Sequence, residues 1–223
     1  MTSADAYTKF ILKINKLNTS TNPYVDKGRF VLIFNEQQNR WLEQQFSKRD
    51  FQALLSIQEL MVDNLELTNG IVHNDGHVDY PLPDDYFDYV VSYTLATRGS
   101  CVGRVVRCWL IKPFDLNDKL RDAYTAPSFD YEETIVTIAN NKIQVYVDDF
   151  TIDKFVFSYY RYAKPIDIIG YVKVDGTLSS NVDPELSDKF VDEIISRCAE
   201  EVMRNFTDTE GFALSKDRIK TEE

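Results

Sequence analysis

The stretch from Ile143 to Tyr171, IQVYVDDFTIDKFVFSYYRYAKPIDIIGY, decides what class of fold this chain can adopt. Its apolar and β-branched residues predict strands over 142–147, 154–162 and 168–174, separated by an acidic turn and a proline break. The second of these strands is rich in tyrosine and carries an arginine. A rigid sheet with such a face suits recognition of another protein better than it suits catalysis.

Amphipathic helices are predicted on the N-terminal side of this β-rich stretch. Apolar residues recur at helical spacing over 3–17, where Ser3 is the predicted N-cap. They recur again over 30–47, although the run FVLIF leaves a strand as an alternative there. Asp50 caps a third predicted helix over 50–65, and three such helices with short links favour a small helical bundle.

Two further helices are predicted from their first turns. The acidic first turn at 83–85 predicts a helix that ends near Gly99. Pro184, at a first helical position, predicts a helix over 184–206 with a long apolar stripe.

The order of helices, then strands, then a helix predicts an α+β fold. We expect a helical bundle formed by the N-terminal and C-terminal helices, with a β-rich, sandwich-like or barrel-like insertion. The predicted domains are a helical portion over 1–67, a β-rich portion with one helix and a long loop over 68–180, a C-terminal helix over 181–206 that packs back on the bundle, and a polar tail over 207–223.

The composition fits a globular protein and limits its partners. The chain has 223 residues, of which 43% are hydrophobic, and a formal net charge of −11. Nucleic-acid binding needs clustered Lys and Arg, so this acidity either keeps the protein soluble or prevents it from holding passing DNA.

Cys101, Cys108 and Cys198 fit no zinc or redox spacing and are expected to be buried thiols in a reducing environment. Neither a signal peptide nor a membrane span is expected.

No metal, cofactor or catalytic site is expected. His73 and His77 are the two histidines, and the turn at 74–76 separates them. They could face each other in the hairpin predicted over 71–80, but no third ligand is expected beside them.

An acidic cluster gives the one alternative enzymatic interpretation. Asp148, Asp149 and Asp153 could hold Mg²⁺ in a small metal-dependent, nuclease-like cytoplasmic enzyme. An acidic turn between strands is the simpler interpretation. A monomeric regulatory binding module is the other alternative to a structural role.

Four residues are the best candidates for a protein interface: Phe129, Tyr131, Tyr159 and Arg161. On a strand, Tyr159 and Arg161 point one way while Tyr160 and Tyr162 point the other, so one pair belongs to the core. The segment 127–131 could be a docking arm that places its phenylalanine in a neighbour's pocket. It could equally fold back on its own sheet.

Four segments follow one another in the order FVLIFNEQQNRWLEQQF (30–46), PSFDYEETIVTI (127–138), VYVDDFTIDKFVFSYYRYAKPIDIIGY (145–171) and VDPELSDKFVDEII (182–195). Together they resemble a family of structural proteins from crAss-like bacteriophages of gut Bacteroides. The likeness covers roughly residues 5–206. Members of that family are head-to-tail connector, or ring, proteins, and there are no catalytic residues to carry over.

The resemblance implies a non-enzymatic virion protein that forms a ring of about twelve copies below the portal and continues the DNA channel into the tail. Its partners would be further copies of itself, the portal protein and other connector or tail ring proteins. Double-stranded DNA would pass through without specific binding, and no membrane is involved. The protein would be assembled in the host bacterial cytoplasm and then reside in the virion.

Overall fold

The computed structural model describes residues 1–17, 24–48 and 55–220, and the chain divides into two compact units. Unit 1 combines Met1–Glu59 with Ala163–Glu223, and unit 2 spans Leu60–Tyr162. The long helices lie in unit 1 and the sheet lies in unit 2, so the predicted α+β class is confirmed. The β-rich unit begins and ends earlier than the predicted limits of 68 and 180.

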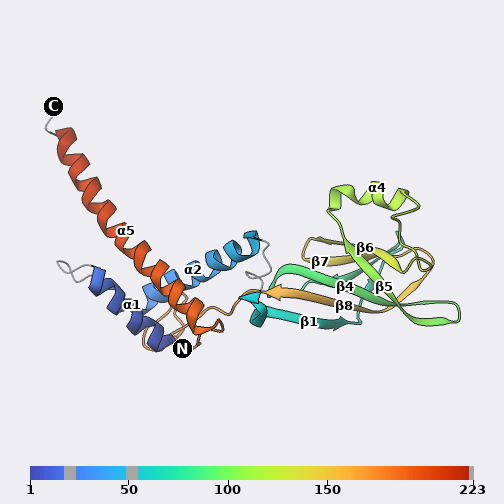
Figure 1. The fold of residues 1–223 in the computed structure, drawn as a ribbon, viewed down its shortest axis with the longest axis horizontal. Coiled ribbons are helices and arrows are strands. Elements are labelled where there is room, and N and C mark those ends of the chain that lie inside the picture. The colour runs from blue at the N-terminus through green and yellow to red at the C-terminus, as the bar shows by residue number, and fades with distance from the viewer. Residues whose placement is uncertain (18–23, 49–54, 221–223) are drawn as a thin grey trace. The chain divides into compact units, whose positions relative to one another are not determined.

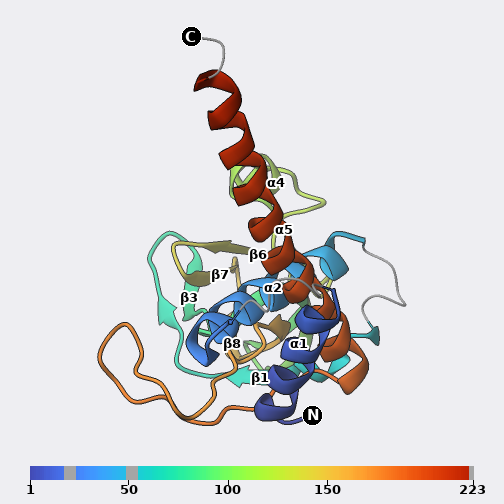
Figure 2. The same cartoon turned by 90° about the vertical axis from the view of Figure 1, so that its left-hand side faces the viewer.

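Unit 1 is built on α1 (Ser3–Leu17), α2 (Lys27–Lys48) and α5 (Asp188–Lys220). Both α1 and α2 pack on α5, and Figure 2 shows α1 running beside it. Lys13 Nζ donates a hydrogen bond of 2.6 Å to Ser196 Oγ, which joins the first helix to the last. The two ends of the chain therefore meet in one unit, while a regular helical bundle stays a prediction.

The start of α1 is capped by Thr2 rather than by the predicted Ser3. The Thr2 Oγ1 atom accepts a hydrogen bond of 3.1 Å from the Asp5 N–H, and the Thr2 N–H donates to Asp5 Oδ2. This is a capping box, in which two donors at the helix start are satisfied reciprocally. Ser3 is buried instead, and its N–H donates to Asp183 Oδ1.

The run FVLIF lies in α2 and is helical, which settles the alternative left open for it. Residues at helical spacing form the buried face of α2: Phe30, Val31, Phe34, Gln37, Gln38, Trp41, Leu42 and Gln45. Asp26 caps this helix, because its Oδ1 accepts a 2.9 Å hydrogen bond from the Arg29 N–H.

The last helix, α5, differs from its predicted range at both ends. It begins at Asp188 rather than at Pro184, because Glu185 is engaged elsewhere and accepts a hydrogen bond from the Lys164 N–H. It also continues through 207–220, where a polar tail was predicted. That segment contains one glycine and no proline, so its sequence holds no strong helix breaker.

Unit 2 is a single mixed sheet of eight strands in the order β1-β8-β4-β5-β6-β7-β3-β2. Figure 1 shows this sheet with most of its strands labelled. The strands are β1 (Met61–Leu67), β2 (Ile71–Val72), β3 (His77–Pro81), β4 (Tyr86–Arg98), β5 (Cys101–Leu110), β6 (Glu133–Ala139), β7 (Lys142–Tyr146) and β8 (Thr151–Arg161). Only the β5–β6 pair is parallel. Its long connection carries the short helices η2 (Pro113–Asp115) and α4 (Leu116–Arg121), while η1 (Gln58–Leu60) precedes β1.

The sheet curls so that strands from its two ends share one core. Phe155, Phe157 and Tyr159 of β8 are buried together with Tyr80 of β3 and Val145 of β7. The rings of Tyr80 and Phe155 stack with centroids 5.1 Å apart. This curled sheet corresponds to the barrel-like form of the predicted insertion and not to a two-sheet sandwich.

Two strands occupy ranges that were predicted to be helical, and β-bulges explain both differences. In β1 the register shifts between Val62 and Leu65, where Asn64 has a φ of +52°. The bulge lets residues three apart face the same core, which imitates helical spacing. Strand β4 contains register shifts of the same kind between Tyr86 and Val91. They interrupt the alternation of inward and outward side chains by which a strand is recognised in a sequence.

The three cysteines do not share one environment, which corrects the expectation that all are buried. Cys101 is exposed at the start of β5, whereas Cys108 and Cys198 are buried. Burial raises the pKa of the Cys108 thiol to about 12 and also raises the pKa of Cys198.

We therefore expect one thiol per native chain to react rapidly with a disulfide reagent at about pH 8, because reaction requires an accessible thiolate. The Cys101→Ser variant should lose this fast phase and keep the two slow thiols, which react on unfolding. The measurement is the stoichiometry of thiol release with time. Two rapidly reacting thiols in the native protein would contradict the described burial.

Candidate functional site

An exposed apolar segment of unit 1, residues 169–178, is the first candidate site and is called the hairpin loop. Its apolar side chains point into solvent: Ile169, Val172, Val174 and Leu178. The predicted strand over 168–174 is absent here, and the bridge between Val172 and Leu178 is the pairing that closes the loop. The predicted turn at Asp175-Gly176 is present, and Gly176 supplies a φ of +81°.

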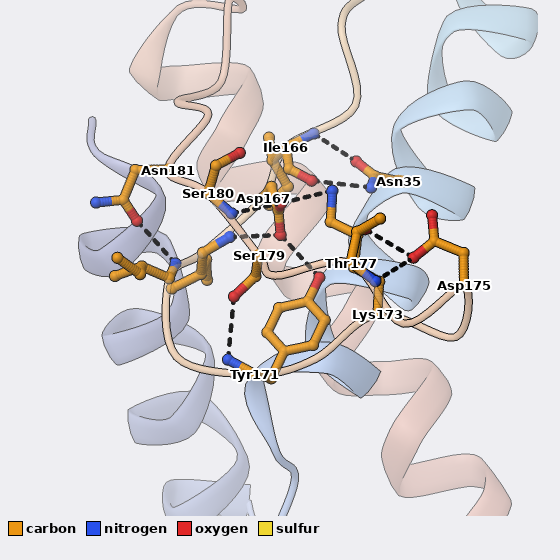
Figure 3. Close-up of polar contacts among 12 residues, drawn as sticks. Asn35, Ile166, Asp167, Tyr171, Lys173, Asp175, Thr177, Ser179, Ser180 and Asn181 are labelled. Carbon is orange, nitrogen blue, oxygen red and sulfur yellow. Dashed lines mark hydrogen bonds and ion pairs between the residues drawn. The ribbon is translucent and has the colours of Figure 1, made fainter.

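One buried carboxylate, that of Asp167, holds the base of the hairpin loop (Figure 3). Its Oδ1 atom accepts hydrogen bonds from the Ile168 N–H at 2.9 Å and from the Tyr171 hydroxyl at 2.7 Å. Its Oδ2 atom accepts from the Ser180 N–H at 3.0 Å and lies 2.8 Å from Lys173 Nζ. The donors come from both sides of the loop, so a single side chain ties its two arms together.

The charge states of this cluster follow from the same contacts. Burial alone would raise the pKa of Asp167, but hydrogen bonds from Lys173, Ser180, Tyr171 and Ile168 hold it far below its usual value. Burial and the hydrogen bond to this carboxylate raise the pKa of Tyr171 to about 12. At neutral pH the cluster therefore consists of a carboxylate and a phenol that donates to it.

Side-chain acceptors satisfy the backbone of the loop as well. Ser179 Oγ accepts from the N–H groups of Gly170 and Tyr171, both at 3.0 Å. Asn181 Oδ1 accepts a 2.9 Å hydrogen bond from the Ile169 N–H. The loop backbone is thus fixed from within, while its apolar side chains remain outside.

Helix α2 supports the loop and forms a groove with it. The Asn35 side chain makes two hydrogen bonds to the backbone of Ile166 (Figure 3). Its Nδ2 donates to the Ile166 carbonyl at 3.1 Å, and its Oδ1 accepts from the Ile166 N–H at 2.8 Å. Lys27 Nζ donates to the carbonyl of Ile169 at 2.9 Å. The groove between α2 and the loop has a volume of about 530 Å³, and its apolar lining includes Val31, Leu32, Val172 and Val174.

Unit 2 carries a second apolar surface, which is called the strand hollow. It has a volume of about 310 Å³ and is lined by Trp109, Leu110, Tyr124 and Ile135, with Lys119 and Glu133 as its charged members. Tyr124 is 89% exposed, and Trp109 and Leu110 are also exposed. The Arg107 guanidinium lies 4.1 Å from the centroid of the Trp109 ring, which holds that indole in place.

The predicted interface residues of the 127–131 segment separate in the structure. Phe129 is 2% exposed and packs under the guanidinium groups of Arg98 and Arg104, at 4.6 and 5.2 Å from its ring centroid. The segment therefore folds back on its own sheet and is not a docking arm. Tyr131 is 72% exposed and remains available for contact.

The predicted interface pair on β8 also divides. Tyr159 is buried in the core, and its hydroxyl donates a 2.8 Å hydrogen bond to Asp85 Oδ1. Burial, together with this hydrogen bond, raises the pKa of Tyr159 to about 12. Arg161 is half-buried near the end of the strand, where it donates to the carbonyl of Tyr162. Tyr159 is thus a core residue, and it presents no surface to a partner.

The acidic residues after β7 are engaged separately. Asp149 Oδ2 pairs with Arg98 at 2.6 Å, and Asp153 Oδ2 accepts a 2.6 Å hydrogen bond from Thr97. Asp148 is exposed. Within the described ranges, these three carboxylates are not a group placed to hold one ion, so nothing in their arrangement favours the nuclease-like alternative.

A different group does bring metal-ligating side chains together. The ligand atoms of His73, His77 and Asp79 all lie within 4.8 Å of one another. Burial alone would raise the pKa of Asp79, but hydrogen bonds from Lys142 and Gln144 hold it below its usual value. Asp79 is the third side chain of this group, and the sequence reasoning missed it. Alternation along β3 could have revealed it, since residues two apart on a strand share a face.

Comparison with known proteins does not assign this chain to a family. No family model matches the chain, and no curated protein is significantly similar to it. Among the residues described, no helix has both the length and the apolar character of a membrane span. Function is therefore inferred from the surfaces above and from the four-segment resemblance.

We expect Asp167→Asn to destabilise unit 1 by about 2 kcal/mol at neutral pH, because an amide cannot accept from all four donors. The folded-state pKa of Asp167 is lowered, so its contribution is present above its unfolded pKa of roughly 4 and is lost as the pH falls. Urea denaturation at several pH values should show the difference from wild type shrinking below about pH 4. Glu200→Gln, an exposed change on α5, is the control. A difference that stays constant in acid would contradict this role.

Proposed function

We propose that this chain is a non-enzymatic structural subunit that assembles with copies of itself into the head-to-tail connector ring of a tailed bacteriophage. The observation that carries the proposal is the hairpin loop, an exposed apolar segment whose backbone is braced by Asp167. The resemblance of four segments to connector proteins of crAss-like phages supports the same role. The portal protein and other ring proteins would be its neighbours in the particle.

The bracing of the loop favours a contact role on energetic grounds. Burying an apolar side chain of valine or leucine size in a partner stabilises a complex by about 1.5–3 kcal/mol. A loop that must first become ordered loses part of that gain to conformational entropy. Because Asp167, Ser179 and Asn181 already fix the backbone, the hairpin loop can dock at little entropic cost.

Two different apolar surfaces favour a ring over a symmetric dimer. A ring needs a heterologous contact, in which one patch of a subunit meets a different patch of the next. The hairpin loop belongs to unit 1 and the strand hollow to unit 2. Each also carries one positive and one negative residue, Lys173 with Asp175 and Lys119 with Glu133. The loop of one copy would therefore seat in the strand hollow of its neighbour.

The net charge is compatible with a channel for DNA. At −11 the chain repels phosphate overall, and binding to DNA backbone depends on Lys and Arg that release counterions. A wall of such subunits would let the genome slide without holding it.

Mass spectrometry of purified particles tests the proposal directly. We expect the chain in virions at about one copy per portal subunit, or at a small whole multiple of it, as a closed ring requires. Its absence from purified particles would overturn the virion role and would favour a regulatory binding module instead.

Cross-linking tests the contact between the loop and the hollow. In a Cys101→Ser background, we expect the double variant Val174→Cys/Tyr124→Cys to give a ladder of oligomers with a short bifunctional maleimide. Val174→Cys alone should give none, since a heterologous contact does not bring two loops together. Efficient cross-linking of the single variant would instead indicate a symmetric dimer.

A matched pair of substitutions separates the loop from general surface effects. Val174→Asp should reduce oligomer formation measured by light scattering. Val102→Asp, at another exposed valine, which lies on β5, should leave it unchanged. Equal effects of the two variants would contradict a docking role for the hairpin loop.

A further inference from the structure

We infer that His73, His77 and Asp79 form a binding site for one divalent transition-metal ion of the zinc class. The inference goes beyond the proposed function and does not depend on it. His73 Nε2 lies 3.2 Å from Asp79 Oδ2, and His77 Nε2 lies 3.3 Å from Asp79 Oδ1. Neighbouring ligands of a tetrahedral Zn²⁺ ion are roughly 3.3 Å apart, given bond lengths of about 2.0 Å. Both imidazoles therefore already stand at ligand spacing from the carboxylate.

The turn between the histidines brings them together. The His73 N–H donates a 2.9 Å hydrogen bond to the carbonyl of His77, and Gly76 supplies the φ of +83° that the turn requires. The two rings stack with centroids 4.5 Å apart and an interplanar angle of 13°. Asp79 follows on the same face of β3 as His77. The hairpin thus collects three ligands from seven consecutive residues, 73–79.

The contacts of His77 show which of its ring nitrogens is turned toward the proposed site. His77 Nδ1 lies 2.9 Å from Asp75 Oδ1, and because a carboxylate only accepts, this ring nitrogen carries the proton. In a neutral imidazole the other nitrogen, Nε2, is then unprotonated, and it faces Asp79 Oδ1. A metal ion that binds here would take the place of any proton on Nε2, between this nitrogen and Asp79 Oδ1. A carboxylate bonded to the outer nitrogen of a histidine is also the usual support of a metal ligand.

The other histidine, His73, has a ring nitrogen that lacks a hydrogen-bond partner within the described ranges. His73 Nε2 is buried, and although it lies 3.2 Å from Asp79 Oδ2, the geometry of that contact is not that of a hydrogen bond, so the atom has no hydrogen-bond partner among the described residues. A buried polar atom without such a partner is unfavourable. Protonating both rings would place two cations 4.5 Å apart, where like charges repel. One divalent ion would instead coordinate both nitrogens.

Two neighbouring side chains, those of Lys142 and Gln144, contact the Asp79 carboxylate and would compete with a metal ion for it. Lys142 Nζ lies 2.9 Å from Asp79 Oδ2, and Gln144 Nε2 donates to Asp79 Oδ1 at 3.3 Å. The Gln144 amide is also 3.5 Å from His77 Nε2, a long contact. The Lys142 side chain is 49% exposed, so its ammonium group can move into solvent when an ion binds. Lys142 would therefore weaken metal binding without preventing it.

The donor set selects the kind of metal. Two imidazole nitrogens and one carboxylate suit Zn²⁺, Co²⁺ or Ni²⁺, whereas Mg²⁺ and Ca²⁺ prefer oxygen ligands. His73 lies at the edge of the turn with 38% of its side chain exposed, so its ring can shift toward an ion held by His77 and Asp79. Three protein ligands would leave the fourth position of the ion open to water.

Titration calorimetry of the full chain, stripped of metal with EDTA and titrated with ZnCl₂ alone, tests the site. We expect about one Zn²⁺ per chain, and a visible absorption band of tetrahedral type when Co²⁺ replaces it. His73→Gln and Asp79→Asn should each weaken binding at least roughly tenfold, while Lys142→Gln should tighten it.

Asn74→Ala, an exposed change in the same turn, is the matched control and should bind as wild type does. Circular dichroism of each variant establishes that it is folded, and the Co²⁺ band of the wild-type chain is a readout that needs no variant. Absence of Zn²⁺ binding by the folded wild-type chain, or equally tight binding by His73→Gln, would overturn the inference.

Discussion

The aromatic row of β8 is the interaction on which the sheet depends. Phe155, Phe157 and Tyr159 all point inward, and the rings of Phe157 and Tyr159 stack with centroids 5.0 Å apart. Strand β8 pairs with both β1 and β4, while Tyr80 from β3 reaches the same row from the far end of the sheet. Burying this row therefore requires the sheet to curl. Curling leaves the alternate residues of β3, which include His77 and Asp79, on the opposite face.

Runs of β-branched and aromatic residues made these strands predictable, and bulges limited the prediction elsewhere. Strands β7 and β8 are rich in such residues and lie close to their predicted ranges, 142–147 and 154–162. Val62 and Leu65 are three residues apart and both face the core, because Asn64 is extra in the ladder. The N–H of that residue is satisfied by Ser158 Oγ, from a strand remote in sequence. A bulge that depends on so distant a partner leaves no local signal, so the segment was taken for a helix.

The candidate site was less predictable than the fold, for a related reason. Tyr131 and Phe129 belong to one aromatic loop, yet the arginine pair that buries Phe129 comes from β4 and β5. The role of Asp167 was invisible because its four donors converge only after the loop has closed. Asp79 was missed as well, but unlike Asp167 it could have been placed from the sequence, because it lies two residues after His77 on a strand.

The two buried carboxylates show how the same chemistry leads to different roles. Asp167 meets four donors that supply protons to both of its oxygens, so its hydrogen-bonding capacity is filled and its role is structural. Asp79 accepts from Lys142 and Gln144, and it also lies beside one imidazole nitrogen of His73 and one of His77. The filled contacts of Asp167 therefore fix the hairpin loop, which the proposed assembly role uses. Asp79 instead has two imidazole nitrogens among its neighbours, and the inferred metal site depends on that difference.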